Sequence, residues 1–192
     1  MAPPSELPIK TFATAAAWET WLAERHASSA GLWLKIAKKA SGIASVTYDE
    51  ALDAALCFGW IDGQKKAFDD EYFLQKFTPR RPRSLWSKRN IEHVARLSAA
   101  GKMRAPGLAE VETAKRDGRF EAAYDSPSGM TVPEDFLAAL EANARAKATF
   151  QSLNRANHYA IAWRLQTAKT KATRKRRFES LLAMLEKGER LH

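Results

Sequence analysis

Residues 55–90 read ALCFGWIDGQKKAFDDEYFLQKFTPRRPRSLWSKRN, and this stretch decides the fold that the sequence predicts. Gly59 ends an apolar helix, and the runs 60–68 and 72–78 have the composition and alternation of two β-strands. An acidic turn joins the two runs, and Pro79 stops the second because proline donates no hydrogen bond to a sheet. We therefore predict a β-hairpin that leads into an arginine-rich turn.

Three further elements are predicted upstream of this stretch. The first ten residues contain three prolines and are predicted to form a loose arm. Thr14 is the predicted N-cap of a helix that ends near Arg25, and residues 31–37 alternate as a strand. Thr47 and Glu50 have the spacing of a capping box, which predicts the start of the next helix.

The chain after the hairpin is predicted to be helical. Ser84 or Leu85 begins a helix that Gly101 closes, and another helix covers residues 106–115. Residues 125–133 (DSPSGMTVP) are small, polar and turn-rich, which indicates a linker. Further helices are predicted over 134–140, 144–152, 155–168 and 171–186.

Together these elements define an α+β fold, with a small antiparallel sheet packed with helices and a C-terminal helical unit. The predicted domains are residues 1–124, which hold the hairpin and the turn, and residues 134–192, packed on the first. A chain of 192 residues can bury a substantial core. Its 45% of hydrophobic and 28% of charged residues argue against a wholly disordered chain.

The charge balance is strongly basic. Lys and Arg number 31 against 22 Asp and Glu, which gives a formal net charge of +9. Such a field favours phosphates, polyanions and acidic surfaces. The alternative is a basic surface that only keeps the protein in solution, since net charge bears on association and not on fold.

The sequence also indicates in which cellular compartment the protein is expected. Cys57 is the single cysteine, so an internal disulfide is excluded, and its apolar neighbours indicate a core residue. The N-terminus lacks the charged start and apolar run of a signal peptide, and no apolar stretch approaches the roughly 20 residues that span a bilayer. We expect a cytoplasmic protein without a membrane span.

Three motifs carry a family resemblance: ALCFGWIDG (55–63), FTPRRPRSLWSKRN (77–90) and AWRLQTAKTKATRKRRF (162–178). Over nearly the whole chain, from about Phe12 to Leu191, the sequence resembles the YdeI or OmpD-associated family, often labelled bacteriocin-protection. The resemblance implies a bacterial protein linked to resistance against bacteriocins or cationic antimicrobial peptides, and it supplies no catalytic residue. A net charge of +9 disfavours direct capture of a cationic peptide, because like charges repel.

The first strand of the hairpin contains one candidate for chemistry. Alternation places Trp60, Asp62 and Gln64 on one side of the strand, a row that is too polar for a core face. The functional interpretation makes Trp60 and Asp62 part of a polar pocket floor. The structural alternative is a salt bridge between Asp62 and a nearby arginine, because buried acids are usually paired.

The turn after the hairpin is the strongest candidate for an anion site. Residues 80–89 hold five Lys or Arg, and the helix that follows presents free backbone N–H groups at its start. A tryptophan in the middle offers a stacking face for a base or a guanidinium. The predicted ligand-binding residues of this turn are Arg80, Arg81, Ser84, Trp86, Ser87 and Asn90. The alternative is a solvated basic turn in which Ser84 only caps the helix.

A third basic run, KTKATRKRR, covers residues 169–177. Helical spacing places Arg174 on the apolar stripe of its helix, so its guanidinium should point inward and needs a partner. With Tyr159 or Trp163 of the preceding helix, Arg174 could complete a ligand pocket. An interhelical salt bridge is the alternative.

Motifs for other chemistry are missing from the sequence. The four histidines show no metal-ligand spacing, and no GxGxxG, P-loop or GxSxG motif occurs. No His–Asp partner stands at a recognisable spacing from Cys57, which disfavours a cysteine nucleophile. The sequence therefore predicts no cofactor, no metal and no assigned catalytic residue.

Three functions remain open on the sequence. The favoured one is a binding module for an anionic ligand: a nucleotide, a nucleic acid, or an anionic lipid or cell-wall fragment. The second is a small-molecule enzyme in which Asp62 or Glu50 is the base and arginines hold an anionic substrate. The third is a stress-related module that binds another protein through its helical C-terminal unit.

Overall fold

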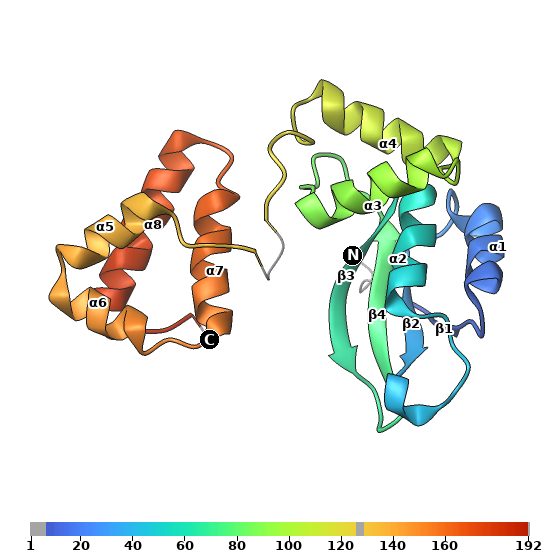
Figure 1. Cartoon of the computed structure of the whole chain (residues 1–192), viewed down its shortest axis with the longest axis horizontal. Helices are drawn as coiled ribbons and strands as arrows, with labels where there is room; N and C mark the ends of the chain where they lie inside the picture. The colour runs from blue at the N-terminus through green and yellow to red at the C-terminus, as the bar shows by residue number, and fades with distance from the viewer. Residues whose placement is uncertain (1–6, 126–128, 192) are drawn as a thin grey trace, which may run out of the picture. The chain divides into compact units, whose positions relative to one another are not determined.

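The computed structural model describes residues 7–125 and 129–191, and the chain divides into two compact units, with the division in the sequence between Ala123 and Tyr124 (Figure 1). Each unit has an apolar cluster of its own. An α+β fold with C-terminal helices is therefore confirmed. The predicted boundaries of the domains stay a prediction, and part of the predicted linker, residues 126–128, lies outside the described residues.

The N-terminal unit contains a four-stranded sheet in the order β1-β2-β4-β3, with β1 parallel to β2 and the other pairs antiparallel. Its elements are β1 (Ile9–Thr11), α1 (Ala15–Arg25), β2 (Leu32–Ala37), a 3-10 turn (Lys39–Ser41), α2 (Tyr48–Cys57), β3 (Trp60–Ala67), β4 (Tyr72–Pro79), α3 (Lys88–Ala99) and α4 (Ala105–Arg116). Helix α2 packs against β3, and α1, α3 and α4 pack against α2 (Figure 1).

Capping explains why two of these helices begin where the sequence predicts. The Thr14 hydroxyl accepts a hydrogen bond from the Ala17 N–H at 3.2 Å. Thr47 accepts from the Glu50 N–H at 3.3 Å, while the Glu50 carboxylate accepts from the Thr47 N–H at 2.9 Å. Each cap satisfies backbone donors that a helix start leaves without partners.

Two predictions of local structure are wrong. Residues Ile9–Thr11 of the predicted loose arm form β1, which pairs in parallel with β2; the structure does not describe residues 1–6. Helix α3 begins at Lys88, with Ser87 as its N-cap, and not at Ser84 or Leu85. Arg83 has a left-handed backbone with φ of 64°, which interrupts the chain before a helix can start there.

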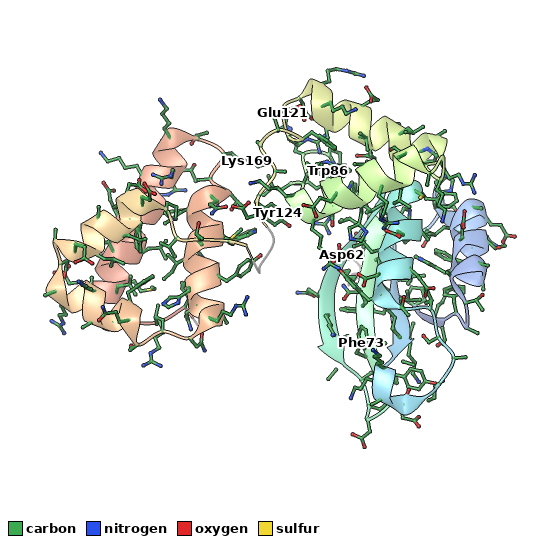
Figure 2. The ribbon with its side chains drawn as sticks, viewed as in Figure 1. Asp62, Phe73, Trp86, Glu121, Tyr124 and Lys169 are labelled. Atoms are coloured by element: carbon green, nitrogen blue, oxygen red, sulfur yellow. The ribbon has the colours of Figure 1, made fainter. Side chains whose placement is uncertain are left out.

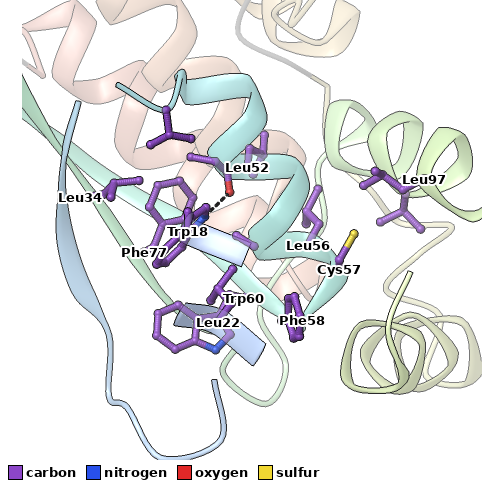
Figure 3. Packing of buried hydrophobic residues seen from close by; sticks show 14 of the residues in the cluster. Trp18, Leu22, Leu34, Leu52, Leu56, Cys57, Phe58, Trp60, Phe77 and Leu97 are labelled. Atoms are coloured by element: carbon purple, nitrogen blue, oxygen red, sulfur yellow. Dashed lines mark hydrogen bonds between the residues drawn. The ribbon is translucent and has the colours of Figure 1, made fainter. Parts of the chain in front are cut away.

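The core of the N-terminal unit is rich in aromatic rings (Figure 3). Trp18 of α1 packs against Trp60 and Phe77, and its indole N–H donates to the Ala51 carbonyl at 3.1 Å. Trp60 is only 1% exposed and donates to the His26 carbonyl. The prediction of Trp60 on a polar pocket floor is therefore wrong, because its ring belongs to the core.

Helix α4 approaches α2 closely because it carries a glycine at the contact. A Cβ atom at Gly107 would lie 2.4 Å from the Cys57 carbonyl oxygen and 2.6 Å from that of Leu56. Both distances are far shorter than van der Waals contact, so only glycine fits between the two backbones.

The regular elements described in the C-terminal unit are helices: α5 (Glu134–Glu141), α6 (Ala144–Gln151), α7 (Arg155–Gln166) and α8 (Lys171–Glu186). Helix α8 contacts each of the other three. The buried residues of this cluster are Phe136, Leu140, Ala146, Leu153, Ile161, Leu165, Leu181 and Leu185. All four helices lie within a residue or two of the predicted ranges.

Candidate functional site

The turn between β4 and α3 directs its first arginine inward. Arg80 is 6% exposed, and its guanidinium carbon lies 3.6 Å from the ring centroid of Trp86, shown in Figure 2. Nη1 of Arg80 donates to the Leu85 carbonyl at 3.2 Å. Trp86 is itself 2% exposed and packs against Phe120. The predicted stacking face thus exists, but a guanidinium of the same chain occupies it.

Two arginines on the outer side of the turn remain exposed to solvent. Arg81 and Arg83 are exposed, and neither forms an ion pair with a carboxylate of the described residues. Beneath them, Ser84 Oγ and Trp86 Nε1 are buried without a hydrogen-bond partner in the described chain. Arg119 crosses to the turn and donates to the Ser84 carbonyl at 3.0 Å. The turn therefore combines a cationic rim with two unsatisfied polar atoms below it.

Ser87 and Asn90 form the start of helix α3. The Ser87 hydroxyl accepts from the Asn90 N–H at 3.2 Å and caps α3, and both residues are buried. The neighbouring Arg89 pairs with Asp49 at 2.7 Å. The sequence offers Ser84 as the cap of this helix, but the hydroxyl that caps it is that of Ser87, three residues later.

Asp62 has a tyrosine as its partner. The Tyr48 hydroxyl donates to Asp62 Oδ2 at 2.8 Å, and no arginine of the described residues forms an ion pair with this carboxylate. Asp62 is labelled in Figure 2. Burial and the adjacent carboxylate raise the pKa of Tyr48. The predicted salt bridge to an arginine is therefore wrong.

The other titratable groups of this unit do not form a nucleophilic site. Burial raises the pKa of the Cys57 thiol to about 11, so it stays protonated at neutral pH. Asp53 is bound by His93 at 2.6 Å and by Arg96 at 2.7 Å. Burial opposes ionisation of Asp53, but these hydrogen bonds outweigh it and lower its pKa. No group of three or more His, Cys, Asp or Glu within the described ranges could hold a metal ion.

Arg174 forms an ion pair between two helices of the C-terminal unit. Its Nη1 and Nη2 donate to the two carboxylate oxygens of Asp135 on α5, at 2.7 and 2.8 Å. The hydrogen bonds from Arg174 lower the pKa of Asp135. This geometry confirms the interhelical salt bridge, the second of the two interpretations of Arg174.

A cavity of about 550 Å³ lies between α7 and α8. Its lining residues are Trp163, Arg164, Arg177, Ser180, Leu181, Ala183, Met184, Lys187 and Glu189. Nη1 of Arg177 donates to the Arg164 carbonyl at 2.7 Å, which fixes the guanidinium against α7. A second hollow of about 360 Å³ shares Trp163 and Arg164 and adds Tyr159.

Three cations and one carboxylate, Glu189, line this cavity. Arg164, Arg177 and Lys187 form no ion pair with a carboxylate of the described chain. Trp163 is 36% exposed although its ring is large and apolar. The cavity thus joins three cations that form no ion pair in the described chain to an accessible aromatic face.

The sequence predicts only some of the residues that line this cavity. Trp163 and Tyr159 were predicted to lie beside a basic residue of α8, but the residue at the cavity is Arg177 and not Arg174. Arg177 precedes the buried Leu181 by four positions, a spacing that places both on one face of the helix. Lys187 lies beyond the end of α8 and carries no pattern that would distinguish it.

Fold and charge together define a basic α+β protein with a separate helical C-terminal unit. Residues 10–110 match the model of a domain of unknown function (DUF8412), and residues 129–188 match the family described as bacteriocin-protection, YdeI or OmpD-associated. The chain therefore belongs to the DUF8412 family. The second match confirms the resemblance to the YdeI or OmpD-associated family for residues 129–188 only, and not over the expected range from about Phe12 to Leu191.

The two matches also divide the motifs. ALCFGWIDG and FTPRRPRSLWSKRN lie in the DUF8412 match, and the basic motif of 162–178 lies in the YdeI or OmpD-associated match. No curated protein and no solved structure matches the chain. Among the described residues, no helix has both the length and the apolar character that a membrane crossing requires.

Proposed function

We propose that the protein is a binding module for an anionic ligand, which it holds in the cavity between α7 and α8. The observation that carries this proposal is the excess of cations around an accessible Trp163: Arg164, Arg177 and Lys187 line the cavity with a single carboxylate, Glu189, and none of the three forms an ion pair with a carboxylate of the described residues. Cations in excess repel one another, and a bound anion lowers that cost.

The lining restricts the kind of ligand. Small-molecule sites enclose about 300–1,000 Å³, so the cavity of about 550 Å³ suits a ligand of metabolite size. Arginine binds phosphate and carboxylate groups through paired N–H donors. Trp163 and Met184 add apolar surface for a flat, uncharged part of the ligand. A nucleotide-like molecule, with a ring and phosphates, combines both features.

The turn at 80–90 stays a predicted second contact for anions. Arg81 and Arg83 supply its charge, whereas Arg80 and Trp86 hold the turn together from inside. Such a site would bind a phosphate on the surface and leave no room for a base on Trp86. A cytoplasmic location also stays a prediction.

The link to bacteriocin protection fits an anionic ligand better than a cationic peptide. At a net charge of +9 the protein repels cationic peptides at long range. We infer that protection, where it occurs, depends on binding a phosphate-bearing or carboxylate-bearing cell component.

Isothermal titration calorimetry with three probes tests the cavity. ATP carries a ring and phosphates, tripolyphosphate carries phosphates alone, and adenosine carries the ring alone. We expect ATP to bind most tightly, tripolyphosphate less tightly and adenosine least, with the affinity for ATP falling as salt rises. The double variant R177A/K187A should lose at least about tenfold in affinity for ATP, or about 1.4 kcal/mol.

The neighbouring Arg176 provides the matched control. It is exposed on the same helix, has the same charge and lies outside the cavity lining. R176A should therefore bind ATP like the unchanged protein. W163A should make ATP and tripolyphosphate bind equally. Equal losses in R176A and R177A/K187A, or no binding of either phosphate probe, would overturn the proposal.

A further inference from the structure

The sheet of the N-terminal unit has two faces of opposite character. Leu32, Leu34 and Ile36 of β2 belong to the core cluster, as does Phe77 of β4. The alternate residues point to the other face, because successive side chains in a strand alternate. The residues of this second face include Trp33 and Lys35 in β2, Tyr72, Leu74 and Lys76 in β4, and Lys66 in β3.

The second face is not part of the apolar core. Trp33, Tyr72 and Leu74 belong to neither of the two buried clusters. Leu74 is nevertheless only 2% exposed, and its partners across the strands are Lys35 on one side and Lys66 on the other. The aliphatic stems of lysines commonly cover apolar surface in this way.

The lysines of this face lie over aromatic rings. Lys66 Nζ is 4.1 Å and Lys76 Nζ is 5.8 Å from the ring centroid of Trp33. Lys35 Nζ is 3.9 Å from the ring of Tyr72. These are cation–π distances, which hold an ammonium in place without neutralising it.

The charges on this face are unevenly balanced. Lys35 has a carboxylate 3.8 Å away, in Asp69 of the hairpin turn. Lys66 and Lys76 pair with no carboxylate of the described residues. The end of the sheet near Trp33 therefore keeps a positive charge, while the hairpin turn at the other end is acidic.

We propose that this lysine and aromatic face of the sheet binds single-stranded nucleic acid. Bases stack on aromatic side chains and phosphates bind nearby cations, and open sheet faces with aromatic residues are a recurrent site for both contacts. Lys66 and Lys76 move from the ring of Trp33 to two phosphates, and the ring face that they leave takes a base. An acidic protein surface would use the lysines but leave the ring without a partner. This site goes beyond the cavity of the C-terminal unit, since it lies on different residues in the other unit.

Fluorescence anisotropy with the full chain and a labelled oligothymidylate of about 15 nucleotides tests the proposal. We expect binding that weakens with salt, and K66A/K76A should reduce the slope of log affinity against log salt by about 1.4, that is about 0.7 for each lost phosphate contact. W33A should lose about tenfold in affinity with an unchanged salt slope.

Lys65 is the matched control. Its Nζ lies 4.1 Å from the ring of Phe73, labelled in Figure 2, and its strand partner Gln75 belongs to the opposite face. K65A thus removes one lysine charge, as each half of the double variant does, and the same kind of contact, and it should bind oligothymidylate within about twofold of the unchanged protein. Circular dichroism of each variant verifies that it is folded.

Several outcomes would overturn the proposal. They are no binding at low salt, equal losses in K65A and K66A/K76A, full affinity in W33A, or equal affinity for duplex DNA or for vesicles with anionic lipids. A loss in R177A/K187A instead of K66A/K76A would assign the nucleic acid to the C-terminal cavity. That last result would reject the sheet face and leave the cavity proposal intact.

Discussion

Two regions of this protein are both rich in Lys and Arg, but their basic side chains have different surroundings. In the turn at 80–90, Arg80 is buried against Trp86 and Arg89 pairs with Asp49, so part of the charge stabilises the fold. Around the cavity of the C-terminal unit, Arg177 and Lys187 form no ion pair with a carboxylate of the described residues. The fold therefore decides which cations of a basic region are paired, and the sequence alone does not show it.

Among the variants that test this comparison, a substitution of Trp86 should lower the free energy of unfolding most. W86A removes a fully buried ring and the surface that Arg80 stacks on, so we expect the free energy of unfolding of the N-terminal unit to fall by about 3–5 kcal/mol. Urea denaturation followed by tryptophan fluorescence measures this. A loss below about 1 kcal/mol would show that the turn does not depend on its interior.

Substitutions of Arg80 and Arg81 distinguish more directly between an arginine that stabilises the fold and one that only adds surface charge. R80A removes a buried cation–π contact and a hydrogen bond to the Leu85 carbonyl, so it should cost about 2–3 kcal/mol of stability. R81A removes an exposed charge and should stay within about 0.5 kcal/mol. Equal costs for the two variants, measured by urea denaturation, would contradict the inward role of Arg80.

The smallest effect should come from the ion pair of Asp135 and Arg174. Its side chains are 53% and 37% exposed, so solvent screening limits the pair to about 0.5–1 kcal/mol in the C-terminal unit. The pKa of Asp135 is lowered in the folded state, so its stabilisation is present above the ordinary carboxyl pKa and is lost as pH falls through the lowered value.

The variant D135N tests this pH dependence. The difference in unfolding free energy between the unchanged protein and D135N should be largest near neutral pH and shrink below about pH 4. K175A, which removes an exposed cation 3.9 Å from Glu179, is the control and should show a smaller difference. A difference that does not change between pH 7 and pH 3 would reject the assignment to Asp135.

The sequence predicts those parts of the fold that depend on local chemistry. Thr14 and Thr47 cap helices because their hydroxyls reach N–H groups three residues on, which spacing alone specifies. Strand β1 escaped prediction because three residues have no pattern, and only the distant β2 gives them a partner. Ser84 and Ser87 suit a cap equally well by type, and the left-handed Arg83 decides between them.

The candidate sites depend on contacts between distant residues, so less of them is visible in the sequence. Whether Asp62 pairs with an arginine or with Tyr48 depends on how α2 packs on β3. The cavity brings Trp163 of α7 to Arg177 of α8, and the sheet face brings Lys66 to Trp33 across β4. Periodicity predicts which side of an element a residue faces, but not which residue it meets there.

The separate apolar clusters of the two units have a consequence for inherited variation. No buried residue of the described chain belongs to both clusters, and each cluster lies mostly within the range of a different family model, although Val111 and Ala114 fall just beyond the first match. A substitution that weakens one core leaves the folding energy of the other largely unchanged, because independent sites contribute additively. Selection can therefore act on the two cores separately, because a substitution inside one core removes no contact from the other.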